Sequence, residues 1–242
     1  MAVQTTFRPE IEDVKKAHNN LSKVIYQTPL QYSFNLSERY GASIHLKRED
    51  TQIVRSYKIR GAYNKITSLT EEELSKGVVC ASAGNHAQGV AFSCFKLGVK
   101  GVIFMPAPTP KQKVQQVKMF GKDQVEVVLK GDTFDDAYQA AMEYRDANNS
   151  TFVHPFDDPK VIEGQATVGL ELFKDAEFTI DYLFLPVGGG GLSAGVSSVM
   201  KLLSPKTKII GVEPAGAPAM YESFQQNKVV TLEKIDKFVD GA

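Results

Sequence analysis

The amino-acid sequence predicts an α/β protein with open parallel sheets and helices on both faces. Short β-rich apolar runs alternate with longer stretches of helical spacing along most of the 242 residues. This strand–helix–strand order implies parallel strands, because each helix carries the chain back across the sheet. Hydrophobic residues make up 43% of the chain and charged residues 23%, which is the composition of a globular protein.

Seven runs and two sets of apolar positions define the expected elements. The expected strands are residues 43–46, 78–81, 102–105, 125–129, 152–154, 182–186 and 208–212. Two expected helices each have an apolar face. The first face comprises Ile59, Ala62, Tyr63, Ile66 and Leu69, and the second, on a later helix, comprises Val114, Val117 and Met119 with Phe120. Thr109-Pro110-Lys111-Gln112 predicts a helix start with an N-cap, a proline at the first helical position and a capping-box glutamine. Thr133 with Asp136 repeats this pattern.

Charge and composition exclude several classes of partner. The 28 basic and 28 acidic side chains balance, so we expect neither a nucleic acid nor a membrane as partner. No apolar run is long enough to span a bilayer, and residues 1–10 lack a signal-peptide pattern. Cys80 and Cys94 form no disulfide framework and have no metal-ligand spacing. We therefore expect a cytoplasmic protein without a metal site.

A run of four glycines is the first candidate for binding chemistry. Gly188, Gly189, Gly190 and Gly191 follow an expected strand and precede Leu192 at the start of a helix. Glycine amides can approach an anion closely, and the helix N-terminus adds favourable partial charge, so the segment predicts phosphate binding. A nicotinamide dinucleotide is one alternative, because Gly189-x-Gly191-x-x-Ala194 and the later Glu213 fit that fingerprint.

Lys58 is the second candidate. It lies where a loop turns into a helix, and Arg55 and Arg60 flank it. Neighbouring cations and a helix N-terminus both disfavour the charged ammonium form, which makes the amine more nucleophilic. Schiff-base chemistry at Lys58 is one reading, and a solvated surface lysine is the other.

The third candidate is the small-residue segment that begins at Ser82. Ser82, Gly84, Asn85 and His86 again lie between a strand and a helix, where a hydroxyl, an amide and backbone N–H groups could hold a carboxylate or a cofactor hydroxyl. Alternatively, Ser82 or Asn85 is a simple N-cap, and we favour a plain helix-start hydrogen bond for His86.

Three further clusters have simpler explanations. The acids Asp132, Asp135 and Asp136 fit a helix start better than a metal site. Residues 154–159 are expected to form a structured loop before a helix. Glu71-Glu72-Glu73 is expected to be a solvated helix start.

Taken together, the three candidate segments resemble the threonine dehydratase family. These enzymes use pyridoxal 5'-phosphate and have the tryptophan-synthase-β-like fold, PLP fold type II. The resemblance rests on three motifs in order, Ser56-Tyr57-Lys58-Ile59-Arg60-Gly61-Ala62, Ser82-Ala83-Gly84-Asn85-His86-Ala87 and Pro186-Val187-Gly188-Gly189-Gly190-Gly191-Leu192. It extends from Tyr26 to Pro214.

The resemblance implies a role for each position. Lys58 would hold the cofactor covalently and act as the base at the substrate α-carbon. Asn85 would hydrogen-bond the cofactor 3′-hydroxyl, and the glycine loop with Leu192 would hold its phosphate. The substrate carboxylate would lie on the loop that comprises Ser82, Gly84, Asn85 and His86, and Tyr57 would be an aromatic neighbour of the cofactor.

The implied reaction is the dehydration and deamination of L-threonine to 2-oxobutanoate and ammonia, the first step of isoleucine biosynthesis. Serine racemases of this family carry a serine where this chain has Ala83, which favours dehydration. Residues 110–113 and 120–121 are closer to the isoleucine-pathway form than to the catabolic threonine/serine dehydratases. A nicotinamide oxidoreductase and a non-catalytic remnant are the alternatives from other classes.

The expected architecture has two lobes. Residues 43–149 would form the smaller lobe, and residues 1–42 with 150–242 the larger, with the cofactor between them at the carboxyl ends of strands. The resemblance implies that family chains continue past Gly241, so we expect an incomplete larger lobe and no regulatory domain. It also implies a homo-oligomer, which is a homotetramer in full-length relatives.

Overall fold

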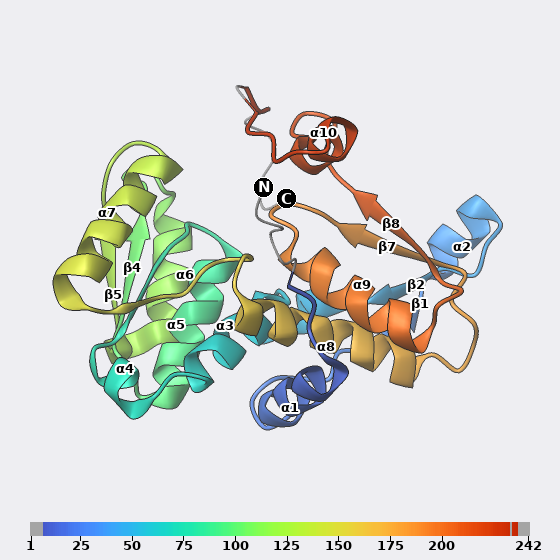
Figure 1. Cartoon of the computed structure of the whole chain (residues 1–242), viewed down its shortest axis with the longest axis horizontal. Helices are drawn as coiled ribbons and strands as arrows, with labels where there is room; N and C mark the ends of the chain where they lie inside the picture. Colours follow the sequence, from blue (N-terminus) through green and yellow to red (C-terminus); the bar gives the residue numbers. More distant parts are fainter. Residues whose placement is uncertain (1–6, 233, 237–242) are drawn as a thin grey trace.

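A four-stranded parallel sheet forms the centre of the lobe at the left of Figure 1. The structure is a computed structural model that describes residues 7–232 and 234–236. The strand order is β5 (Val125–Leu129), β4 (Gly101–Met105), β3 (Val78–Ala81) and β6 (Thr151–Phe152). Helices α5 (Asn85–Leu97), α6 (Lys111–Gly121) and α7 (Phe134–Asn148) connect these parallel strands.

Helices cover both faces of this sheet, as the sequence predicts. Cys80 and Ile103 belong to one buried cluster with side chains of α5 and α6. Their neighbours Val79 and Val102 point to the opposite face, where they pack with α7. Because side chains alternate along a strand, two buried faces require a nearly continuous apolar run, and β3 and β4 have one.

The second lobe contains two small sheets. Strands β7 (Tyr182–Pro186) and β8 (Lys208–Val212) are parallel and are connected by α9 (Gly191–Leu203). Strand β1 (Leu30–Tyr32), which was not among the expected strands, pairs antiparallel with β2 (His45–Lys47). Strand β2 therefore pairs with β1 and not with the four-stranded sheet, whereas β6, which follows residue 149, belongs to that sheet. The lobe boundaries at residues 43 and 149 stay a prediction.

Helix α8 (Pro159–Asp175) begins between the lobes and runs beneath the right-hand lobe (Figure 1), and it is buried from Val161 to Leu172. It contacts α1 (Ile11–Leu21), α3 (Lys58–Thr67) and α9. Glycines make the crossings close: a Cβ on Gly164 would lie 2.5 Å from the Arg60 carbonyl oxygen, and one on Gly195 2.6 Å from that of Ile162. The lobes are therefore held together through a tightly packed helix.

Helix starts agree with the sequence at one of two predicted caps. Thr133 and Asp136 form a capping box at the start of α7. The prediction at Thr109 is wrong, because extended Pro110 is the N-cap and α6 begins at Lys111 without a side-chain cap. Met119 is also misplaced: it lies about 200° around the helix from Val117, and it is 61% exposed.

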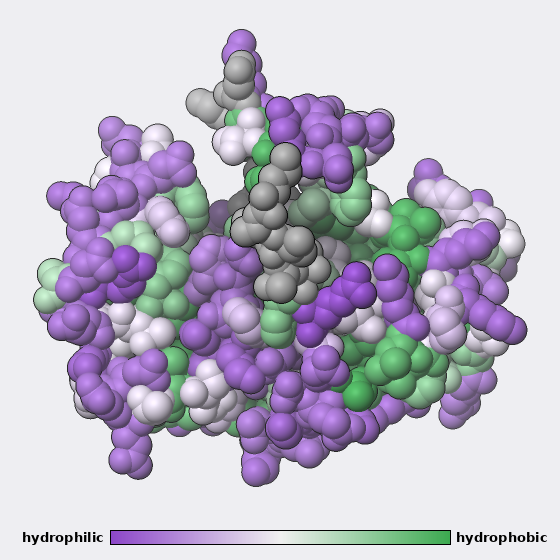
Figure 2. Space-filling view, viewed as in Figure 1, coloured by the Kyte–Doolittle hydropathy of each residue, from purple (hydrophilic) through white to green (hydrophobic). Residues whose placement is uncertain are grey.

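Short elements complete the described part of the chain. They are α2 (Phe34–Tyr40), η1 (Glu49–Thr51), α4 (Glu71–Ser75), η2 (Lys122–Gln124) and α10 (Ala219–Gln226). Apolar surface gathers on the side of α9, β7 and β8 in Figure 2, and Phe184 and Val212 are exposed on the outer sheet face. Within residues 7–232 and 234–236, each helix is too short or too polar to cross a bilayer.

Candidate active site

Three loops that follow the carboxyl ends of parallel strands form the candidate site. Residues 82–84 follow β3, residues 153–158 follow β6, and residues 187–190 follow β7. Because β3 and β6 are parallel neighbours, their following loops leave the same edge of the sheet. This edge is where open α/β sheets bind ligands.

Lys58 is the first residue of α3 and faces the loop after β6. Its Nζ donates a hydrogen bond to the carbonyl oxygen of Pro155 at 2.8 Å and lies 5.6 Å from the centre of the Tyr57 ring. Helix α5 crosses directly beside it, since a Cβ on Gly89 would lie 3.1 Å from the Lys58 carbonyl oxygen. The α5 segment that begins at Asn85 is thereby brought against the lysine.

Burial lowers the pKa of Lys58 to about 8. From the sequence we expected the flanking cations to lower this pKa, and that explanation is wrong. Arg60 carries its charge away from Lys58 into ion pairs with Glu49 and Glu171, so it does not repel the ammonium. The loss of hydration is the physical cause, because it penalises the charged form of an amine. A substantial fraction of the amine is therefore neutral near pH 8.

The loop between β3 and α5 presents backbone rather than a buried side-chain cluster. The Ser82 hydroxyl accepts a hydrogen bond from the Gly84 N–H at 3.2 Å, and exposed Asn85 opens α5. His86 is buried, and its Nε2 donates to the Val153 carbonyl oxygen at 2.8 Å. Burial first, and then the Lys58 charge, lowers the pKa of His86 to about 3. Its imidazole is neutral, and the bond that it makes is a long-range contact to the residue after β6 rather than the helix-start hydrogen bond that we expected; the buried Nδ1 has no hydrogen-bond partner among the described residues.

The glycine loop has the geometry of an anion cradle. Gly188 and Gly189 are exposed, and Gly190 has φ +86°, a conformation that favours glycine. Gly191 begins α9, so the loop amides lie at a helix N-terminus. Leu192 is buried in the core, so its contribution to any ligand is restricted to its backbone.

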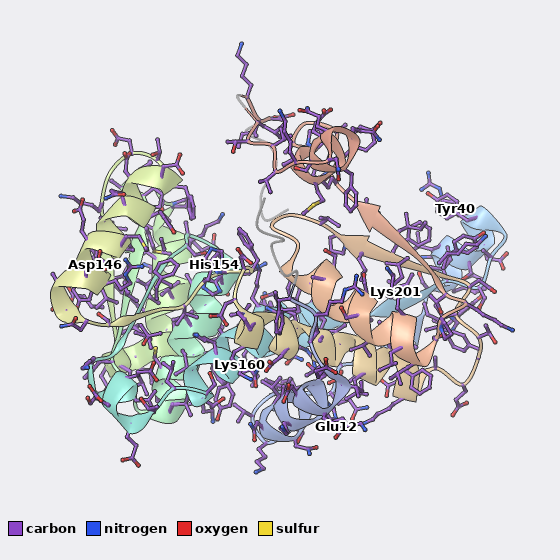
Figure 3. All side chains as sticks on the ribbon, viewed as in Figure 1. Glu12, Tyr40, Asp146, His154, Lys160 and Lys201 are labelled. Atoms are coloured by element: carbon purple, nitrogen blue, oxygen red, sulfur yellow. The ribbon has the colours of Figure 1, made fainter. Side chains whose placement is uncertain are left out.

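The loop His154-Pro155-Phe156 joins the lysine to the glycine loop; the sequence predicts a structured loop here, but not its place in the site. Pro155 accepts from Lys58, while Cβ atoms on Gly189 and Gly191 would both collide with Phe156. His154 shapes the turn, because its Nδ1 accepts the N–H of Asp157 at 2.7 Å. Figure 3 shows His154 between the left lobe and α8. The available signal was its position directly after a strand of the parallel sheet.

Glu213 has a structural role that removes one argument for a nicotinamide site. Its two carboxylate oxygens accept the N–H groups of Met220 at 2.9 Å and Tyr221 at 2.7 Å. The carboxylate therefore caps the start of α10, where acids are favoured. A ribose-binding acid would need free oxygens.

The site defines a class of cofactor enzyme. A half-buried amine of lowered pKa fits the aldehyde of pyridoxal phosphate, and a glycine cradle at a helix N-terminus fits its phosphate. A side chain at Gly189 would fill this cradle against Phe156. Residues 21–242 match the family described as "Pyridoxal-phosphate dependent enzyme", and the chain belongs to it.

Relatives of known name share most of this chain. It is 59% identical over 233 residues to the biosynthetic L-threonine dehydratase of Halalkalibacterium halodurans, which covers 96% of this chain and 56% of that protein. The corresponding enzyme of Bacillus subtilis is 55% identical over 233 residues, 96% of this chain and 55% of that protein. The chain thus spans about half the length of the curated relatives it matches.

Solved structures show the same architecture. The processed form of threonine deaminase isoform 2 from Solanum lycopersicum matches with a TM-score of 0.87 at 42% identity, over 98% of this chain and 66% of that one. Maize serine racemase matches with a TM-score of 0.90 at 30% identity, over 95% and 69% of the two chains. The predicted α/β fold of this class is confirmed.

Proposed function

We propose that this protein catalyses the pyridoxal-phosphate-dependent dehydration and deamination of L-threonine to 2-oxobutanoate and ammonia. The observation that carries the proposal is the Lys58 amine, half-buried, with a pKa lowered to about 8 and held by the Pro155 carbonyl beside the glycine loop. The names of the relatives in Halalkalibacterium halodurans and Bacillus subtilis support threonine as substrate.

Each part of the cofactor has residues to hold it. Lys58 would bind its aldehyde, and the amides of Gly188, Gly189, Gly190, Gly191 and Leu192 its phosphate. Asn85 would hydrogen-bond its 3′-hydroxyl from the start of α5. When bound, pyridoxal phosphate supplies an electron sink for negative charge at the α-carbon of an amino acid.

The chain's own residues would then orient the substrate and move one proton. The N-terminus of α5, with the backbone at Ser82, Gly84, Asn85 and His86, would hold the substrate carboxylate. Lys58 Nζ would take the proton from the α-carbon, a general-base step that typically contributes about 10²–10⁴-fold. Loss of the β-hydroxyl as water, followed by hydrolysis, yields 2-oxobutanoate and ammonia.

Ala83 favours dehydration over racemisation. A racemase needs a second proton-transferring group on the opposite side of the α-carbon, and the alanine methyl group cannot transfer a proton. The alanine lies half-buried between Ser82 and Gly84 on the loop proposed for the carboxylate. L-serine and L-threonine should therefore be dehydrated rather than inverted.

The physiological setting follows from the same relatives. We place the reaction at the first step of isoleucine biosynthesis, in the cytoplasm, and the protein in a homo-oligomer, a homotetramer for full-length chains. Gel filtration with light scattering tests the assembly.

The test is an absorption spectrum of the chain loaded with pyridoxal phosphate, before and after L-threonine, with a parallel assay of 2-oxobutanoate. The expected result is a protein-bound band that threonine shifts, and a borohydride-reducible adduct on Lys58. Lys58→Ala should lose the adduct. Lys65→Ala, on the same helix, should keep it. A reducible adduct retained in Lys58→Ala, or inversion of L-threonine to D-allo-threonine without formation of 2-oxobutanoate, overturns the proposal.

A further inference from the structure

Arg60 is the most thoroughly buried charge in the described part of the chain. Its side chain is 0% exposed and lies on α3 two residues after Lys58. Its Nε and Nη2 donate to both oxygens of Glu49, at 2.8 and 2.7 Å. Its Nη1 and Nη2 donate to both oxygens of Glu171, at 2.6 and 2.9 Å. One guanidinium therefore makes two bidentate contacts, the strongest geometry available to an arginine.

The two carboxylates belong to different parts of the molecule, and each has its own anchor. Glu49 lies in η1 and accepts the Thr28 hydroxyl at 2.5 Å. Glu171 lies in α8 and forms an ion pair with Lys47 at 2.8 Å. Arg60 thus connects α3 to η1 and α8, and we call this set of side chains the arginine clamp.

The start of α3 packs against α5 and buries Ile59, but it lacks capping by side chains of the described residues. Its N-cap position is Tyr57, which makes no side-chain capping hydrogen bond. The preceding Ser56 hydroxyl is buried without a hydrogen-bond partner in the described part of the chain. An uncapped helix start is expected to fray, because its leading N–H groups lack acceptors. The clamp adds a side-chain anchor at the third residue of this turn.

Rigid placement of this turn matters for the site. The Lys58 amine bonds to a single carbonyl oxygen, that of Pro155, at 2.8 Å. A displacement of the helix start by about 1 Å would exceed the range of that contact, and misplacement on this scale costs catalysts as much as about 10²-fold. Lysine at position 60 would retain the charge but lose the planar, doubly bidentate fork.

We propose that the arginine clamp is the positioning device for Lys58: Arg60, through Glu49 and Glu171, holds the first turn of α3 where its lysine can meet an aldehyde-bearing cofactor. Its consequence for catalysis rests on the function proposed above. Its consequence for the backbone does not, since the clamp acts on α3 with or without cofactor. Arg60 itself touches no reacting group.

The experiment compares Arg60→Lys with Ile66→Ala in the full 242-residue chain. Ile66 is fully buried on the same helix but packs in the core of the four-stranded sheet, so it controls for lost stability. Hydrogen exchange of residues 57–64 reports on the first turn. Borohydride trapping of added pyridoxal phosphate on Lys58 reports on amine placement. Thermal midpoints are measured for both variants.

In Arg60→Lys, the backbone amide hydrogens of residues 57–64 should exchange at least tenfold faster than in the parent chain. Borohydride trapping of pyridoxal phosphate on Lys58 should be at least tenfold slower. Ile66→Ala should stay within twofold of the parent in both measurements, although it lowers the thermal midpoint by removing buried apolar atoms. Glu49→Gln, which keeps the Glu171 contact, should give an intermediate result and serves if Arg60→Lys fails to fold.

Unchanged exchange in the clamp variants overturns the inference, and so does equal loss in Ile66→Ala. A parent chain that traps no pyridoxal phosphate refutes the proposed function alone. In that case the exchange comparison still decides whether the clamp holds α3.

Discussion

Replacing Lys58 with methionine should stabilise the apo-protein at neutral pH. Burial lowers the pKa of this amine from 10.5 to about 8. At 1.36 kcal/mol per pKa unit, the difference corresponds to about 3 kcal/mol of destabilisation when the amine is charged. Methionine fills similar space without charge, but it loses the hydrogen bond to Pro155, worth about 1 kcal/mol. The net expectation is a gain of about 2 kcal/mol at pH 7.

The difference in stability between Lys58→Met and the parent chain should depend on pH. Above pH 10.5 the amine is neutral in both the folded and unfolded states, so burial carries no charge penalty. Between pH 10.5 and about 8 the unfolded chain binds more protons than the folded one, so stability falls as the pH falls. Below about pH 8 the full penalty is present. The advantage of Lys58→Met should therefore be largest at pH 7 and vanish or reverse by pH 10.5.

Urea unfolding of the parent chain and Lys58→Met, without cofactor, measures both effects. Lys65→Met is the matched control: Lys65 lies on the same helix as Lys58, and its ammonium pairs with Asp158 at the start of α8 at 2.8 Å, so its loss should not stabilise the protein. A Lys58→Met variant less stable than the parent at pH 7, or a difference that is constant from pH 7 to 10.5, would refute the reasoning. Such a gain from removing a site residue is the expected trade of stability for reactivity.

Three further predictions follow from packing, capping and burial. Gly164→Ala should destabilise the protein by about 1–3 kcal/mol in urea unfolding, despite the better helix propensity of alanine, because its Cβ would lie 2.5 Å from the Arg60 carbonyl oxygen. Thr133→Ala should lose about 1 kcal/mol by the same assay, since it deletes a capping box; an unchanged midpoint would contradict this. Burial raises the thiol pKa of Cys80 and of Cys94, the latter to about 12, so alkylation should await unfolding.

Local sequence patterns were sufficient to predict most strands of the larger parallel sheet and of the β7–β8 pair. Four strands, at residues 78–81, 125–129, 182–186 and 208–212, have the expected bounds, because each is an apolar run bounded by turn residues. The short β1 and β2 lack such a pattern: one is missing from the prediction and the other is shifted, since their pairing partners and not their own residues make them strands. The start of α6 was misplaced because Pro110 is extended.

The candidate site divides in the same way. Motif chemistry alone marked Lys58, the segment at Ser82 and the four glycines. Motifs could not reveal the loop at Pro155 and Phe156, because its importance comes from distant contacts. Pro155 bonds to Lys58, which is 97 positions away along the chain, and Phe156 packs against Gly189, about 33 positions away.

Neighbouring residues were enough to predict the α/β class, Lys58 and the glycine cradle, because strand runs, helix starts and loop glycines act over a few positions. The cause of the lowered Lys58 pKa depends instead on contacts between distant segments. The flanking arginine that adjacency suggested is neutralised by Glu49 and Glu171, and burial against another loop performs the task instead. Charge pairing and desolvation depend on distances through space, and α8 brings those distant segments together.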